Sequence, residues 1–210
     1  MVPQARVSGG ARVVACVPPV ATSMHDTHPL TAYWSKRDFR RTPEPRGRLS
    51  HRAGKPRFVV QLHEAHRAHF DLRLEIGGVL KSWSLPTGPS VDPRERRVAI
   101  PTEDHPVQYA RFEGTIPAGL YGAGRMLLWD EGTWEHLEEG APADCHARGR
   151  LALRLAGRKL RGAFALFRPP RGRRSAWVLV KLEDEEADAE TDVVVLRPHV
   201  VRRAGRRRKR

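Results

Sequence analysis

With 210 residues the chain can form one domain with a sizeable core, and its net charge of +14 predicts a polyanionic partner such as nucleic acid. The two cysteines, Cys16 and Cys145, lie far apart and outside any CxxC pair, which argues against a disulfide framework and a zinc ribbon. No apolar run approaches the roughly 18 residues of a membrane helix, and Pro18-Pro19 interrupts the apolar N-terminal stretch, so we expect a soluble, cytoplasmic protein.

The N-terminal part of the chain predicts little regular structure. Residues 1–30 are rich in Pro, Gly and small residues and show no sustained period, so we expect a disordered extension, within which Met24 is an alternative start. The segment Thr31–Arg41 is expected to form one short helix. Pro and Gly return in Thr42–Lys55, which we expect to be a loop that carries Glu44.

The clearest pattern lies between Phe58 and Leu85. Residues 70, 72, 74 and 76 are apolar and residues 69, 71, 73 and 75 are polar, a period of two that is typical of a half-buried strand. A second run begins at Val79 after Gly77-Gly78, and two glycines suit a type I′ turn because that turn needs positive φ at both central residues. The sequence therefore predicts a β-hairpin whose first strand has one polar face.

Short strands punctuated by Gly and Pro continue through the rest of the chain. They are expected at Arg96–Pro101, at Arg125–Asp130 before a turn at Glu131-Gly132, along the alternating Leu151, Leu153 and Leu155, at Ala163–Phe167, and at Trp177–Leu182. The fold class is therefore mostly β, a small closed or partly open antiparallel β-barrel with a short N-terminal helix, although the spacing also fits a sandwich. We expect the domain to cover residues 31–182, with an acidic segment and a basic tail over 183–210.

The basic tail holds half of the excess positive charge, because seven of its last nine residues are Lys or Arg. Two interpretations stay open, a solvated end and an arm that contacts DNA. The candidate nucleic-acid-binding residues are Arg206, Arg207, Arg208, Lys209 and Arg210.

The hairpin carries a candidate metal site. His63, His69 and Asp71 form an H-x5-H-x-D set of two imidazoles and a carboxylate, which suits a divalent transition metal such as Mn²⁺ or Zn²⁺ and leaves positions open to substrate. Taken alone, the same spacing also describes surface histidines. Arg73 shares the strand face with His69 and Asp71, and a guanidinium beside a metal is suited to holding a phosphoryl group. We expect His66, in the connection between the strands, to be exposed.

Other residues carry weaker signals. His105 can donate a proton to a leaving oxygen and Tyr109 can hydrogen-bond a phosphate oxygen, although both also fit an ordinary loop. Arg37-Asp38 offers either a further phosphate-binding cation or a surface ion pair. Most of the tryptophans are expected to pack in the barrel, with stacking on a base as the alternative, and they are Trp83, Trp129, Trp134 and Trp177.

Three long segments resemble a known family. VVQLHEAHRAHFDLRLEIGGVLKSWSLPTGPS, EDHPVQYARFEGTIPAGLYGAG and LLWDEGTWE are, in this order, similar to the 3′-phosphoesterase module of bacterial DNA ligase D. That module belongs to the non-homologous end-joining repair system and also occurs as a free-standing protein. The resemblance covers residues 33–135 closely and extends more loosely to residue 182. The N-terminal extension and the basic tail lie outside the pattern.

The resemblance implies a small Mn²⁺-dependent β-barrel that removes a 3′-terminal ribonucleoside from DNA and then the remaining 3′-phosphate, leaving a 3′-hydroxyl. It implies the metal ligands His63, His69 and Asp71. It implies the catalytic residues His105, Arg73, Tyr109 and Arg37. It implies the supporting residues Gln61, Glu103, Asp38 and Glu44.

From these residues we expect a free-standing DNA 3′-end-processing phosphoesterase that uses Mn²⁺ or another divalent transition metal. Its partners would be DNA 3′ ends and, because the polymerase and ligase parts are absent from this sequence, a separate ligase and end-joining proteins. Two alternatives stay open. One is a non-catalytic module that binds DNA ends, and the other is a metallo-phosphodiesterase acting on RNA or cyclic phosphates.

Overall fold

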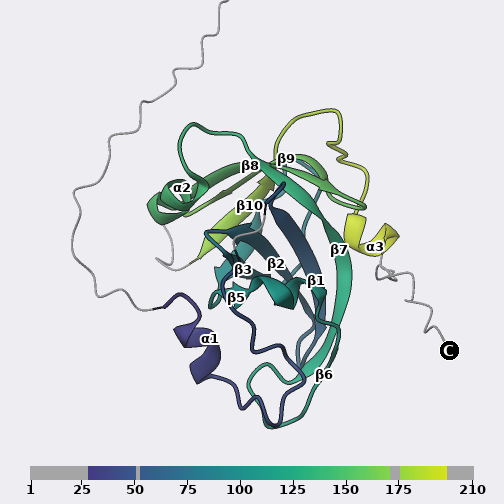
Figure 1. The fold of residues 1–210 in the computed structure, drawn as a ribbon. Coiled ribbons are helices and arrows are strands. Elements are labelled where there is room, and N and C mark those ends of the chain that lie inside the picture. The colour runs from purple at the N-terminus through teal and green to yellow at the C-terminus, as the bar shows by residue number, and fades with distance from the viewer. Residues whose placement is uncertain (1–27, 51–52, 171–175, 198–210) are drawn as a thin grey trace, which may run out of the picture.

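The structure is a computed structural model that describes residues 28–50, 53–170 and 176–197 (Figure 1). Most of the expected N-terminal extension and the whole basic tail lie outside these residues. Within them, no helix is both long enough and apolar enough to cross a membrane.

Eight antiparallel strands close into a barrel, which confirms the expected fold class (Figure 1). In order around the barrel they are β1 (Arg57–Glu64), β2 (His69–Ile76), β3 (Val79–Leu85), β4 (Arg97–Pro101), β10 (Trp177–Lys181), β9 (Arg161–Phe167), β8 (Arg150–Gly157) and β7 (Gly124–His136). The ring closes because β7 pairs with β1 as well as with β8.

Short elements complete the fold around this ring. Two small strands extend it, β6 (Gly114–Ile116) beside β7 and β5 (His105–Pro106) beside β3. The helices are α1 (Thr31–Ser35), the 3₁₀ helix η1 (Val107–Arg111), α2 (Pro142–Arg148) and α3 (Val193–Leu196). The sequence did not predict α2, α3, η1, β5 or β6, each of which has seven residues or fewer. Val193 of α3 packs in the barrel core, so the packed chain continues past residue 182.

The predicted hairpin forms between β2 and β3. Gly77 and Gly78 connect the strands with φ of 60° and 81°, the two positive values that a type I′ turn requires. Alternate side chains of β2 then point to opposite sides of the barrel wall. Leu72 and its apolar neighbours fill the interior, whereas Asp71 and Arg73 lie on the outer face.

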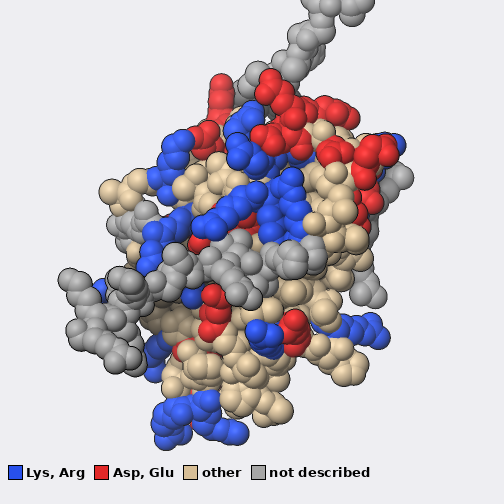
Figure 2. Space-filling view, turned by 90° about the vertical axis from the view of Figure 1, so that its right-hand side faces the viewer, with Lys and Arg blue, Asp and Glu red and all other residues tan. Residues whose placement is uncertain are grey.

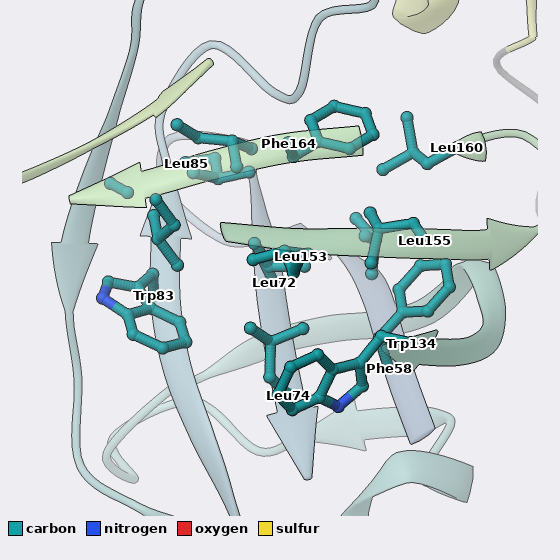
Figure 3. Close-up of a cluster of buried hydrophobic side chains, with 14 of the residues drawn as sticks. Phe58, Leu72, Leu74, Trp83, Leu85, Trp134, Leu153, Leu155, Leu160 and Phe164 are labelled. Carbon is teal, nitrogen blue, oxygen red and sulfur yellow. The ribbon is translucent and has the colours of Figure 1, made fainter. Parts of the chain in front are cut away.

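Two hydrophobic layers bury the strands that carry the site. The barrel interior is filled by apolar side chains from strands around the ring, among them Leu72 of β2, Phe164 of β9 and Trp134 of β7 (Figure 3). A second cluster lies against the outer face of β1 and combines Val59 with Tyr33 and other side chains. Because this layer covers the polar face of β2, Asp71 and Arg73 are only 6% and 2% exposed, and the strand is not half-buried as predicted.

The tryptophans belong to the barrel interior. The four that the sequence analysis singled out have at most 5% of their surface exposed, and they are Trp83, Trp129, Trp134 and Trp177. Their expected packing is confirmed, and none is available to stack on a nucleic-acid base.

The predicted helix Thr31–Arg41 is wrong in length, because α1 ends at Ser35. The reason lies in Arg37, whose side chain folds back and donates from Nη1 to the carbonyl oxygen of Tyr33 at 3.1 Å. This hydrogen bond satisfies a carbonyl group that the helix end leaves free. The chain then turns away, and the Arg37 guanidinium is buried beside Tyr33.

The predicted turn at Glu131-Gly132 is also wrong, because β7 continues to His136. Gly132 serves a close approach between strands: a Cβ there would lie 2.1 Å from the carbonyl oxygen of Ala156 in β8. The strand also contains a bulge. Val60 of β1 pairs with Asp130 and Gln61 with Leu128, so Trp129 is the extra residue.

We expect Gly132→Ala to lower the free energy of unfolding by about 1–3 kcal/mol, because the added methyl group forces β7 away from β8. Urea denaturation measures the change. The control is Thr133→Ala in the same strand, for which we expect about 1 kcal/mol or less. A Gly132→Ala protein as stable as the wild type would contradict this close pairing.

Candidate active site

The candidate site is a pocket of about 230 Å³ on the outer face of the barrel wall. Strands β1 and β2 form its floor, and the segments around α1, β5 and η1 supply its sides. It brings together nine of the residues singled out from the sequence, which are Arg37, Glu44, His63, His69, Asp71, Arg73, Glu103, His105 and Tyr109.

Three of these residues form the candidate metal site. His63 pairs directly with His69 across the two strands, and Asp71 lies two residues further along β2 on the same face. His63 Nδ1 is 3.2 Å from His69 Nε2, which is 3.7 Å from Asp71 Oδ1. All three donor atoms lie within 4.8 Å of one another, so one ion can reach them together.

Each of the two imidazoles is hydrogen-bonded in the way that a metal-binding histidine requires. Nε2 of His63 donates to the carbonyl oxygen of Gly122 at 3.1 Å, and Nδ1 of His69 donates to that of Arg67 at 2.9 Å. Each ring therefore keeps its other nitrogen, the one in the cluster, free of a proton, as metal-binding histidines do. Burial lowers the pKa of His63 by more than the neighbouring Asp71 carboxylate raises it, so the ring is held in the neutral form that a metal requires.

Arg73 lies beside the candidate metal site, and two of its three guanidinium nitrogens donate to side-chain acceptors. Nε donates to Gln61 Oε1 at 2.8 Å and Nη2 donates to Asp71 Oδ2 at 3.0 Å, while Nη1 lies 3.0 Å from His105 Nδ1. Gln61 is itself fixed, because its Nε2 donates to the Phe112 carbonyl oxygen at 2.9 Å. Gln61 thus acts from behind the pocket by holding Arg73 in place.

A second buried cation, Arg37, joins the N-terminal segment to the pocket. Its Nε donates to Glu44 Oε1 at 2.9 Å and its Nη1 to Glu103 Oε1 at 2.8 Å. Glu44 also accepts from the Tyr109 hydroxyl at 3.0 Å. Burial alone would raise the pKa of Glu103, but hydrogen bonds from Arg37 and Lys36 outweigh it and hold the pKa below its usual range.

His105 lies between the two guanidinium groups and is 3% exposed. Its Nδ1 is 2.8 Å from the Glu103 carbonyl oxygen, and its Nε2 is 3.3 Å from Arg37 Nη2. A neutral ring with its proton on Nδ1 donates to the Glu103 carbonyl oxygen and accepts from Arg37 Nη2, so its contact with Arg73 Nη1 is a close approach and not a hydrogen bond. Burial, together with the charges of Arg73 and Arg37, lowers the pKa of His105 well below its usual range.

The structure does not bring every predicted residue into the pocket. Asp38 lies outside it, with a side chain that is 36% exposed and that accepts a hydrogen bond from Arg40. His66 is exposed, as expected. The tail residues from Arg206 to Arg210 lie outside the described residues.

Residues that the sequence analysis did not assign to the site also line the pocket. Tyr121 is 50% exposed, and its hydroxyl donates to Glu103 Oε2 at 3.3 Å and lies 3.3 Å from Lys36 Nζ. The remaining ones are Ser84, Thr102, Ile116, Gly122 and Met126. Only the fold places the loop that carries Tyr121 against β1, where the Gly122 carbonyl oxygen lies 3.1 Å from His63 Nε2.

Comparison with known proteins agrees with this geometry. Residues 61–168, more than half of the chain, match the family described as the DNA Ligase D 3′-phosphoesterase domain. The chain is 46% identical over 183 residues to the multifunctional non-homologous end joining protein LigD of Pseudomonas aeruginosa, which covers 85% of this chain and 22% of that protein.

Two mycobacterial relatives agree with this match. The chain is 38% identical over 162 residues to the protein of the same name from Mycolicibacterium smegmatis, and 40% identical over 158 residues to the multifunctional non-homologous end joining DNA repair protein LigD of Mycobacterium tuberculosis. Each match covers 75% of this chain, and the chain spans only about a fifth of each relative, 21% and 20%. With its barrel and pocket described above, this chain belongs to the DNA ligase D 3′-phosphoesterase domain family.

Proposed function

We propose that this protein hydrolyses phosphate esters at DNA 3′ ends, removing a terminal ribonucleoside and then the 3′-phosphate to leave a 3′-hydroxyl for end joining. The observation that carries the proposal is the meeting of a metal-binding trio, two buried guanidinium groups and a buried imidazole in one pocket. The relatives' names place them in non-homologous end joining, which supports DNA as the substrate. A separate ligase would then act on the product in the same compartment, the cytoplasm.

The charges of the pocket support a divalent cation as cofactor, and we propose Mn²⁺. The carboxylates of Asp71, Glu44 and Glu103 face the cations Arg37, Arg73 and Lys36, so the protein groups balance one another. A bound dication would leave a surplus of two positive charges, which suits a phosphate dianion. When bound at His63, His69 and Asp71, Mn²⁺ would supply Lewis-acid polarisation of a phosphate oxygen.

The protein groups then position the phosphate and stabilise its developing charge. Arg73 is rigid because Gln61 and Asp71 hold two of its nitrogens, so little reorganisation is needed when the phosphate binds. Arg73 lies at Nδ1 of the His105 ring, and Nη2 of Arg37 lies at the other ring nitrogen, 3.3 Å from Nε2. In our proposal the Tyr109 hydroxyl, which donates to Glu44, positions that carboxylate against Arg37.

His105 is the proposed proton donor to the leaving oxygen. The free protein holds the ring neutral, because burial and two adjacent guanidinium groups disfavour its charged form. A phosphate dianion in the pocket opposes those guanidinium charges and raises the pKa of the ring. The imidazole can then take up a proton and transfer it to the leaving group.

The surface charge suits a DNA backbone. Figure 2 shows Lys and Arg side chains gathered on one face of the molecule, with acidic side chains along its upper margin. Such a face attracts phosphates independently of sequence. We propose that the tail from Arg206 to Arg210 adds to this attraction.

We expect His69→Ala to lower kcat/KM by more than about 100-fold on a primer–template that ends in one 3′-ribonucleotide, because it removes a metal ligand. The wild type should convert this substrate stepwise to a 3′-phosphate and then a 3′-hydroxyl with Mn²⁺, and chelator should stop both steps. The matched control is His66→Ala, three residues away and exposed, which should keep wild-type activity and Mn²⁺ affinity.

Two results would redirect the proposal. Tight DNA binding without any conversion would mean a module that only binds DNA ends. Faster turnover of a competing 2′,3′-cyclic phosphate would identify an RNA or cyclic-phosphate diesterase.

We expect the His105 ring to remain neutral around neutral pH in the free protein and to titrate at a higher pH when inorganic phosphate is bound. The measurement is a histidine NMR titration with diamagnetic Mg²⁺, and His105→Gln assigns the resonance. An unchanged or lowered pKa in the phosphate complex would refute the role of the ring as an acid.

The same ring makes the free energy of unfolding depend on pH. Because the unfolded chain takes up this proton near pH ~6.5 and the folded chain does not, the free energy of unfolding should fall as the pH drops below that value.

A further inference from the structure

A second group of metal-binding side chains lies outside the pocket. His136 is the last residue of β7, Glu138 follows in the adjoining loop, and Cys145 is in α2. Their donor atoms lie within 4.8 Å of one another, and His136 Nε2 is 3.8 Å from Glu138 Oε2. None of the three lines the candidate active site. Figure 1 shows α2 at the end of the barrel opposite β6, which lies beside that site.

The imidazole of His136 is the observation that points to a ligand. Its side chain is only 9% exposed, and within the described part of the chain its buried Nε2 has no hydrogen-bond partner. A buried polar nitrogen without a partner is costly, and native structures almost always satisfy such groups with protein, water or an ion. Nε2 faces the carboxylate of Glu138 from beyond hydrogen-bond distance, which leaves room for an ion between them.

The other two side chains are held near His136 by hydrogen bonds to the protein. Glu138 Oε1 accepts from Arg150 Nε at 2.6 Å, and Oε2 accepts from the backbone N–H of Ala152 at 3.0 Å. Cys145 is 5% exposed and free of any disulfide. Its Sγ accepts from Arg148 Nη2 at 3.1 Å and donates to the Glu139 carbonyl oxygen at 3.8 Å, and an ion bound to the thiolate would replace that second contact. Hydrogen bonds of this kind commonly fix carboxylate and thiolate ligands from the outer shell of a metal site.

We propose that His136, Glu138 and Cys145 bind a Zn²⁺ ion, with water as the fourth ligand. A nitrogen, an oxygen and a sulfur together suit a borderline-soft ion, whereas Mn²⁺ favours oxygen and nitrogen, so the two sites would take different metals. Ligands around a tetrahedral zinc ion lie roughly 3.5 Å apart, so donor atoms that lie within 4.8 Å of one another need to close by at most about 1.3 Å. The bound ion would join α2 and the loop before it to the end of β7.

Cobalt tests this proposal because a thiolate bound to Co²⁺ gives a near-ultraviolet charge-transfer band, which a ligand set of nitrogen and oxygen cannot give. The full chain is prepared as His63→Ala, so that the active-site trio is impaired, and Co²⁺ is added. We expect the band together with one tightly bound ion per chain, and Zn²⁺ should displace the Co²⁺ and raise Tm.

Matched variants locate the ligand. In the same background, Cys145→Ser should abolish the band and weaken Zn²⁺ binding at least about tenfold, whereas Cys16→Ser, at the only other cysteine, should change neither. Glu138→Gln keeps the sulfur and should weaken binding while retaining the band, and circular dichroism checks that each variant is folded. A wild-type-like band in Cys145→Ser, or no band in the folded parent, would overturn the proposal.

Discussion

The buried guanidinium of Arg73 is the constraint on which the rest of the site depends. A charge that is 2% exposed must be fully partnered, because its lost hydration costs several kcal/mol. Its acceptors come from both strands of the wall, Gln61 on β1 and Asp71 on β2, and its Nη1 lies 3.0 Å from the His105 ring on β5. Satisfying one cation therefore fixes a candidate metal ligand and places a positive charge against the proposed acid. The geometry of the site follows from charge neutralisation as much as from any demand of the reaction.

The site also depends on how the barrel wall is covered. Strands β1 and β2 face the interior with one set of side chains and the outer layer with the other, and both sets are buried. Tyr33 and Tyr109 pack in that outer layer, and both also contact Arg37 or Arg73. Packing and electrostatics are thus supplied by the same residues, so the segment around α1 belongs to the site although it contributes only five helical residues.

Sequence patterns predicted the hairpin and the candidate ligands because these depend on local spacing. Gly77-Gly78 permits one turn geometry, and residues two apart on a strand necessarily share a face. Nothing local showed that the polar face would be covered, because Tyr33 reaches it from distant sequence. The same limit explains Gly132: a glycine after an acidic residue suggests a turn, and only the pairing of β7 with β8 shows that it accommodates the Ala156 carbonyl. Tyr121 lies far along the chain from the ligands it accompanies.

The extra residue in β7 has a further consequence for that strand. Before Trp129, Met126 and Leu128 point to the outer layer, and after it Trp134 points to the barrel interior. The alternation of side chains along β7 therefore shifts by one residue at the bulge, so equivalent positions before and after it face opposite sides of the barrel wall. Its first half supports the floor of the site from outside, and its second half fills the core. In a strand with strict alternation, residues 128 and 134 would have faced the same side, so the bulge is what allows a single strand to line both the core and the candidate site.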